Sequence, residues 1–307
     1  MVEKRIKIAG YQPEGSILSQ SLNIFGRSLA NENPDIKTEF TFNIMDIGKA
    51  PEEIIKLVSD GVYDVGYISS SYFAKKIPEL YIFDIPFLIK NRQQAYNLIE
   101  SPYQEQISAE VSEKYNLTLL SIWDYGFRHF SNHEYPIKTL ADCKGLLFRT
   151  LINDLHLKMF ASLGFKAEKL QVSEYLSRIK SGEKIAQENA LTNFYNFQLH
   201  HYHRYLSITN HLLGMALLIC NKDTFSTLTT EQKKQFLSAA SSSAITQREL
   251  AIAEEKVVLE KLKNNGVLVY NLSDNEKAAF KKALSKTALP FRDKIGTKAL
   301  EHLEITN

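Results

Sequence analysis

The chain is poor in cysteine and tryptophan, and it has no long uncharged apolar run. Its 307 residues include two cysteines, Cys143 and Cys220, and one tryptophan. Without CxxC spacing, two cysteines exclude a disulfide framework and favour two small buried side chains over a bridge or a metal site. No apolar run reaches the roughly 18 residues that a membrane-spanning helix needs. The sequence therefore predicts neither a disulfide-rich scaffold nor a membrane-spanning segment.

An excess of charge of one sign is also absent. The chain has 37 basic and 35 acidic residues, for a formal net charge of +2. This balance gives no support for nucleic-acid binding, and no block of like charges forms a tail. Hydrophobic residues make up 44% of the chain, which is ample for a core, and the length suits two domains or one large one.

The first ten residues are not typical of a signal peptide. The stretch from Met1 to Gly10 mixes charged and apolar residues, and its apolar part is too short for the h-region of a leader. It is more typical of a charged lead into a first strand. Two expectations stay open: the protein remains inside the cell, or the chain is a mature form whose leader has been removed.

Apolar periodicity in the first part of the chain alternates between strand and helix. The predicted strands are 5–9, 38–45 and 61–68, and the predicted helices are 17–31 and a short one that opens at 50–53. This rhythm predicts a mostly parallel sheet with right-handed crossovers. Ligands in such sheets bind at the carboxyl ends of the strands. We therefore expect a binding edge that includes Tyr11, Gln12, Ser69, Ser70 and Ser71.

A second series of strands and helices is predicted to begin near residue 124, where we place the first domain boundary. An apolar loop at 78–89, a helix at 91–113 and a strand at 117–123 precede it. The later strands are predicted at 127–131, 145–149, 165–168 and 184–187, the helices at 152–163 and 173–181, and a β-like stretch at 202–220.

A long helix is predicted from Thr229 to Asn264. Thr229 and Gln232 have the spacing of a capping box, and Gly266 stands just past the end, where glycine is favoured. At 1.5 Å per residue such a helix is roughly 50 Å long, so we expect it to run along both domains. A further capped helix is predicted at 273–286.

Two arginines are candidate anion-binding residues. Arg149 ends the apolar run 146–148, and Arg128 lies in the strand-like segment 127–131. A guanidinium matches a carboxylate with two parallel hydrogen bonds. The alternative is an internal ion pair, for instance with Asp124 or Glu188, and the residues alone favour it.

The remaining polar clusters give weaker indications. Gln187 and Asn189 could donate to ligand oxygens, although their spacing favours a crossover turn. The histidines in 200–203 could suggest a metal site, but neighbours on a strand point to opposite faces, so an exposed aromatic-rich segment is favoured. The serines at 69–71 form no nucleophile elbow, and no Walker A, GxGxxG or HExxH motif occurs. We therefore predict no enzyme, no cofactor and no metal.

Taken in order, these residues resemble the substrate-binding proteins of the tripartite ATP-independent periplasmic (TRAP) transporters. The similar positions are Trp123, Gly126, Arg128, Phe130 and Asn132, then 136–139, 141–142, 144–145 and Arg149, then 187–189, Tyr202, Tyr205 and 209–211. The first part of the chain adds Gly61, Asp64 and 84–88. The likeness covers essentially the whole chain, with Ala186 and Ala190 departing from the family's turn around Asn189.

The resemblance implies a fold class of two α/β domains of periplasmic-binding-protein type, joined by a hinge and a long helix. The expected domains are 1–123 plus about 211–245, and 124–210 plus about 246–307, with an organic acid in the cleft between them. Arg149 matches the family arginine that pairs with the ligand carboxylate. The other ligand-binding residues that we predict are Arg128, Asn189, Gln187, Trp123, Tyr67, Tyr11, Gln12, Ser69, Ser70 and Ser71.

The function implied is that of an extracytoplasmic solute-binding protein. It is expected to work in the periplasm as a monomer, and to deliver a small organic acid, such as a C4-dicarboxylate or a sugar acid, to a membrane permease. Two alternatives from other classes stay open. One is a sensor component that presents an organic acid to a receptor, and the other is a cytoplasmic α/β enzyme acting on a carboxylate.

Overall fold

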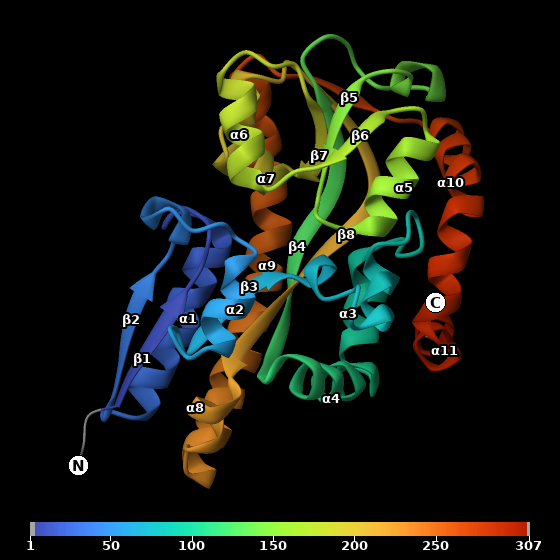
Figure 1. Ribbon diagram of the computed structural model, residues 1–307. Helices are drawn as coiled ribbons and strands as arrows, with labels where there is room; N and C mark the ends of the chain where they lie inside the picture. The colour runs from blue at the N-terminus through green and yellow to red at the C-terminus, as the bar shows by residue number, and fades with distance from the viewer. Residues whose placement is uncertain (1–3, 306–307) are drawn as a thin grey trace. The chain divides into compact units, whose positions relative to one another are not determined.

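The chain forms two compact α/β units, so the predicted fold class is confirmed (Figure 1). The computed structural model describes residues 4–305. Within these residues the first unit comprises 4–69, 104–124 and 215–253, and the second comprises 70–103, 125–214 and 254–305. The long strands β4 (Leu117–Asn132) and β8 (Tyr205–Asn221) each contribute residues to both units.

The sheet of the first unit is built on a parallel core. Strand β1 (Lys4–Ala9) pairs in parallel with β2 (Ile36–Thr41) and β3 (Val65–Ser69), as Figure 1 shows. β3 then pairs antiparallel with residues 216–220 of β8. The alternation of strand and helix dictates this order, because each parallel pair needs a crossover helix between its strands. The helical elements of this unit are α1 (Ile17–Glu32), η1 (Ile44–Ile47), α2 (Glu53–Ser59), α4 (Tyr103–Tyr115) and α8 (Lys222–Ser226).

In the strands of the second unit, β7 (Ala186–Ala190) lies between β4 and β5 (Leu147–Thr150). β7 is antiparallel to β4 and parallel to β5, and β5 is parallel to β6 (Lys166–Lys169). Strand β9 (Leu268–Asn271) pairs with the first residues of β8. The helices of this unit are α3 (Arg92–Ile99), α5 (Asp154–Ser162), α6 (Val172–Lys180), α7 (Leu191–Asn196), α10 (Asp274–Ile295) and α11 (Thr297–Ile305). Its 3₁₀ turns are η2 (Ser70–Tyr72), η3 (Pro78–Phe83), η4 (Leu140–Cys143) and η5 (Leu199–His201).

The predicted long helix is confirmed as α9 (Thr230–Asn264). The Thr229 hydroxyl accepts from the Gln232 amide at 3.2 Å, and the Gln232 side chain accepts from the Thr229 amide at 3.0 Å, which is the predicted capping box. Gly266 follows the helix with φ +84°, a conformation that glycine adopts at little cost. Residues 230–253 belong to the first unit and 254–264 to the second. Among the described residues, no helix has the length and apolarity needed to cross a bilayer.

Several predicted boundaries were wrong, each for a local reason. The helix predicted over 91–113 is two helices, α3 and α4, because Pro102 between them cannot continue a helix. The strands predicted at 117–123 and 127–131 are one strand, β4, in which Gly126 takes φ +97°. The segment 199–201 forms a 3₁₀ turn, and His203, expected on the surface, is buried.

Segment 70–103 packs with the second unit, whereas the prediction placed it with the first. Asp84 in this segment accepts a hydrogen bond from Asn153 at 3.1 Å, and the Phe87 amide donates to the His211 carbonyl at 2.8 Å. Such long-range bonds leave no periodic pattern in the sequence. Both cysteines are buried and free, as their spacing indicated.

Candidate functional site

Three polar residues of the second unit lie side by side across its sheet. In the strand register, Ser131 of β4 is opposite Gln187 of β7, and Gln187 is opposite Arg149 of β5. Successive side chains of a strand point to opposite faces, so these three share one face of the sheet. Arg128 and Glu188 belong to the other face.

Arg149 is buried without a negative partner. Its side chain has 1% of its surface exposed, its Nε donates to the Leu170 carbonyl at 3.0 Å, and its guanidinium lies 5.6 Å from the ring centre of Tyr175. Among residues 4–305, its Nη2 has no hydrogen-bond partner, and no carboxylate lies at ion-pair distance from its guanidinium. Burial lowers the pKa of Arg149, since the charge has lost its water. An uncompensated buried cation is costly, so this geometry suits an external anion.

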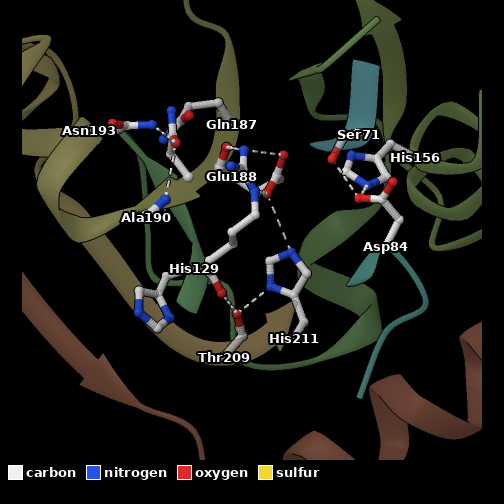
Figure 2. Close-up of polar contacts among 12 residues, drawn as sticks. Ser71, Asp84, His129, His156, Gln187, Glu188, Ala190, Asn193, Thr209 and His211 are labelled. Atoms are coloured by element: carbon white, nitrogen blue, oxygen red, sulfur yellow. Dashed lines mark hydrogen bonds and ion pairs between the residues drawn. The ribbon is translucent and has the colours of Figure 1, made fainter. Parts of the chain in front are cut away.

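Arg128, in contrast, has an internal partner. Its Nε and Nη2 donate to the two carboxylate oxygens of Glu188, the second at 2.8 Å, and both residues are buried. Figure 2 shows Glu188 and His211 facing each other, with His211 Nε2 at 3.6 Å from the carboxylate and Thr209 beside His211. This is the internal ion pair that the residues alone favoured. A role of Arg128 in ligand binding stays a prediction.

In the ion pair, each charge counteracts the effect of burial on the pKa of the other group. Burial by itself raises the pKa of Glu188, but the charge and the hydrogen bonds of Arg128, with His211 nearby, hold that pKa well below its ordinary range. Burial by itself would lower the pKa of Arg128, but the adjacent negative charge of Glu188 has the larger effect, so the pKa of Arg128 is raised. Both groups are therefore charged in the folded protein.

The amide of Asn189 stabilises a turn in the structure. Its Oδ1 accepts from the Ala190 amide at 3.0 Å and from Asn193 Nδ2 at 2.9 Å, at the start of α7 (Figure 2). This is the turn role that the spacing favoured. The pocket role implied by the resemblance stays a prediction.

The residues predicted in the first unit gather around an aromatic cluster. Tyr11 lies just beyond the end of β1, and its ring centre is 5.1 Å from that of Tyr67 in β3. Tyr67 is in turn 5.8 Å from Trp123, whose buried Nε1 has no hydrogen-bond partner. Gln12 is also buried here, and Ser69 is the last residue of β3. Of the residues expected at the binding edge, Tyr11, Gln12 and Ser69 thus lie at the carboxyl ends of the neighbouring parallel strands β1 and β3.

Ser70 and Ser71 belong to the second unit, in which Ser71 joins a buried cluster that the sequence analysis missed. The Asp84 carboxylate accepts from Ser71 Oγ at 2.6 Å and lies 3.0 Å from His156 Nε2 (Figure 2). It also accepts from Asn153 Nδ2 at 3.1 Å. The only signal for it was an acid inside the apolar segment 78–89. Because an acid is seldom buried without partners, this position could have been marked as a polar centre.

The second unit also has two cavities. They have volumes of about 280 and 390 Å³ and are lined by segment 85–90 and α10, with 209–210 at one end of the larger. No predicted site residue lines either of them.

Histidine 203 should make the folded protein sensitive to acid. Burial lowers the pKa of His203 to about 3, from an ordinary value of 6.5. Between these values the unfolded chain binds a proton that the folded protein does not, so the free energy of unfolding falls as the pH drops from 6.5 toward 3. The change is about 1.4 kcal/mol per pH unit for one such group.

Urea unfolding at pH 7.5 and 5.5 tests this expectation. The variant His203→Gln should lose less stability between the two pH values than the wild type does. His201→Gln is the matched control, because His201 is exposed, and it should behave like the wild type. Equal pH dependence of both variants would contradict the role of His203.

Two α/β units are the architecture of a solute-binding protein of the periplasmic type. The chain matches the bacterial extracellular solute-binding protein family 7, DctP, over residues 11–292, and it belongs to this family. The resemblance to TRAP substrate-binding proteins is thereby confirmed.

Individual relatives are distant in sequence but close in fold. The chain is 26% identical to the 2,3-diketo-L-gulonate-binding periplasmic protein YiaO of Escherichia coli K12 over 233 residues, which cover 76% of this chain and 70% of YiaO. The sugar acid binding protein DctPAm from Advenella mimigardefordensis, solved with galactonate, superimposes with a TM-score of 0.93 at 22% identity, covering 100% of this chain and 98% of that one. A TRAP periplasmic solute-binding protein from Sulfurospirillum deleyianum, solved with succinate, gives a TM-score of 0.91 at 23% identity, with 100% of each chain covered.

Proposed function

We propose that this protein captures a small organic acid outside the cytoplasm and delivers it to a TRAP-type membrane permease. The observation that carries the proposal is Arg149. Among residues 4–305, its buried guanidinium has one donor without a hydrogen-bond partner and no carboxylate at ion-pair distance. A carboxylate accepts two parallel hydrogen bonds from such a group and neutralises it. The ligands of the relatives, galactonate, succinate and 2,3-diketo-L-gulonate, are acids.

The proposal extends to the remaining predicted features. The residues Tyr11, Gln12, Tyr67 and Trp123 contribute to the binding of the acid. The ring contacts that join Tyr11, Tyr67 and Trp123 in the first unit support this. The protein works in the periplasm as a monomer. Closure of two domains on the ligand, which the resemblance implies, stays a prediction.

A thermal-shift screen with matched acids and neutral analogues tests the proposal. Galactonate and galactose form one pair, and succinate and its diamide form another. An acid present at 100 times its dissociation constant should add about 2.7 kcal/mol to the free energy of unfolding and raise the melting temperature. Melting shifts with neutral compounds but with no acid would contradict the proposal.

A further inference from the structure

Two buried polar atoms without partners lie on the shared face of β5 and β7. One is the donor Nη2 of Arg149, and the other is the acceptor Oε1 of Gln187. Their residues are neighbours in the strand register, and each is 1% exposed. Buried polar groups in folded proteins almost always have partners, so an unpaired donor beside an unpaired acceptor indicates a ligand that supplies both an acceptor and a donor.

The orientation of the Gln187 amide follows from a chain of hydrogen bonds. The Tyr175 hydroxyl donates to the Ile185 carbonyl at 3.4 Å, so it accepts from His203 Nε2 at 3.2 Å. Burial lowers the pKa of His203 to about 3, so the ring is neutral and carries one proton. That proton is on Nε2, because Nε2 is the atom that donates to Tyr175.

The other end of the chain reaches the amide. His203 Nδ1, which has no proton, accepts from Ser131 Oγ at 2.8 Å. Ser131 Oγ thus donates its one hydrogen to His203, and it accepts a hydrogen bond from Gln187 Nε2 at 2.7 Å. The Gln187 carbonyl oxygen is consequently the atom left for a ligand. A flipped amide would place its oxygen against a Ser131 oxygen that has no hydrogen to give.

From this geometry we infer that Gln187 selects acids that carry a hydroxyl group near the carboxylate. The carboxylate binds Arg149, and the neighbouring hydroxyl donates to Gln187 Oε1. The inference rests on the proposed function and narrows its substrate class to hydroxy acids. Ser131 and His203 act as positioning residues, because they orient the amide without touching the ligand.

The arrangement discriminates in two ways. An acid without the hydroxyl leaves the Gln187 oxygen buried and unpaired, and a buried acceptor without a donor costs enough to lower affinity about tenfold or more. A second carboxylate at the same place is also disfavoured, because it would face the lone pairs of the Gln187 oxygen. Sugar acids fit this site better than unsubstituted dicarboxylates.

Calorimetric titration with matched probes tests the inference. Galactonate is compared with its 2-deoxy and 3-deoxy analogues, and malate with succinate. The wild type should bind the hydroxy acid about tenfold or more tightly than the matching deoxy acid in at least one pair. Gln187→Leu should abolish this ratio while it keeps the affinity for the deoxy acid, and Gln171→Leu, at an exposed position of the same unit, should keep the ratio.

Ser131→Ala provides a second measurement should Gln187→Leu fail to fold. It frees the amide to rotate, so the hydroxy-to-deoxy ratio should fall toward one while carboxylate binding persists. A purely structural role of Ser131 would lower both affinities equally and keep the ratio. Equal binding of all matched pairs by the wild type would overturn the inference and leave the proposed function intact. Binding of no acid at all would overturn the proposed function, and the inference with it.

Discussion

Replacing Arg149 by methionine should weaken the binding of organic acids by at least about 100-fold. Truncating one partner of a buried, hydrogen-bonded charge pair costs several kcal/mol, and each 1.4 kcal/mol is a factor of ten. On the proposed function, the ligand carboxylate would lose the guanidinium with which it pairs. Titration calorimetry with an acid that stabilises the wild type measures the change.

The same variant should leave the unliganded protein as stable as the wild type, or more stable. Arg149 is buried, and in the described part of the chain no carboxylate lies at ion-pair distance from it. Glu168, its neighbour in the strand register, pairs with Arg178 instead. An apolar side chain of similar size removes that uncompensated charge. Thermal unfolding without ligand checks this, and loss of binding in a fully folded protein separates a ligand role from a structural one.

A surface arginine is the matched control. Arg178 of α6 pairs with Glu168 and Glu183 at the surface of the same unit. Arg178→Met should keep the wild-type affinity and change stability by no more than about 1 kcal/mol. Acid binding by Arg149→Met with wild-type affinity would exclude Arg149 as the carboxylate ligand.

Replacing Arg128 by methionine should, unlike Arg149→Met, destabilise the folded protein, by about 3–5 kcal/mol. The change leaves Glu188 as an unpaired charge, and that carboxylate is completely buried. His211 can only partly compensate, because burial lowers its pKa and so disfavours its protonated form. Urea unfolding at neutral pH measures the loss.

The double variant Arg128→Met/Glu188→Leu is the control for this result. It removes both charges and fills the space with apolar atoms, so it should recover most of the lost stability. If the single variant is as stable as the wild type, the ion pair is not a structural element and Arg128 is available to a ligand. If the double variant is no better than the single one, side-chain packing rather than charge explains the loss.

The two arginines show how far sequence reasoning reached at the candidate site. Both stood in strand-like segments, and both allowed either an internal ion pair or an external anion. The register of β4, β7 and β5 separates them. It places Arg128 and Glu188 on one face of the sheet, where they form an ion pair, and Arg149 opposite Gln187 on the other face. That register depends on residues about 40 to 60 positions apart, which no local pattern connects.

Local features were predicted well where their cause was local. The capping box of Thr229 and Gln232 and the glycine after α9 depend on a few neighbouring residues, and both predictions were confirmed. The helix predicted over 91–113 was wrong because the apolar periodicity continues past Pro102, whereas the helix itself does not. Its effect is local and was available in the sequence.

Periodicity, caps and the order of motifs along the chain were enough to predict the α/β class, the long helix and the family. Which arginine has an internal carboxylate partner is visible only in the folded protein. The tertiary structure alone also oriented the Gln187 amide, through a chain of bonds from Ile185 to Ser131. The physical reason is that burial and pairing depend on neighbours in space, and a charge becomes costly only when the fold removes its water.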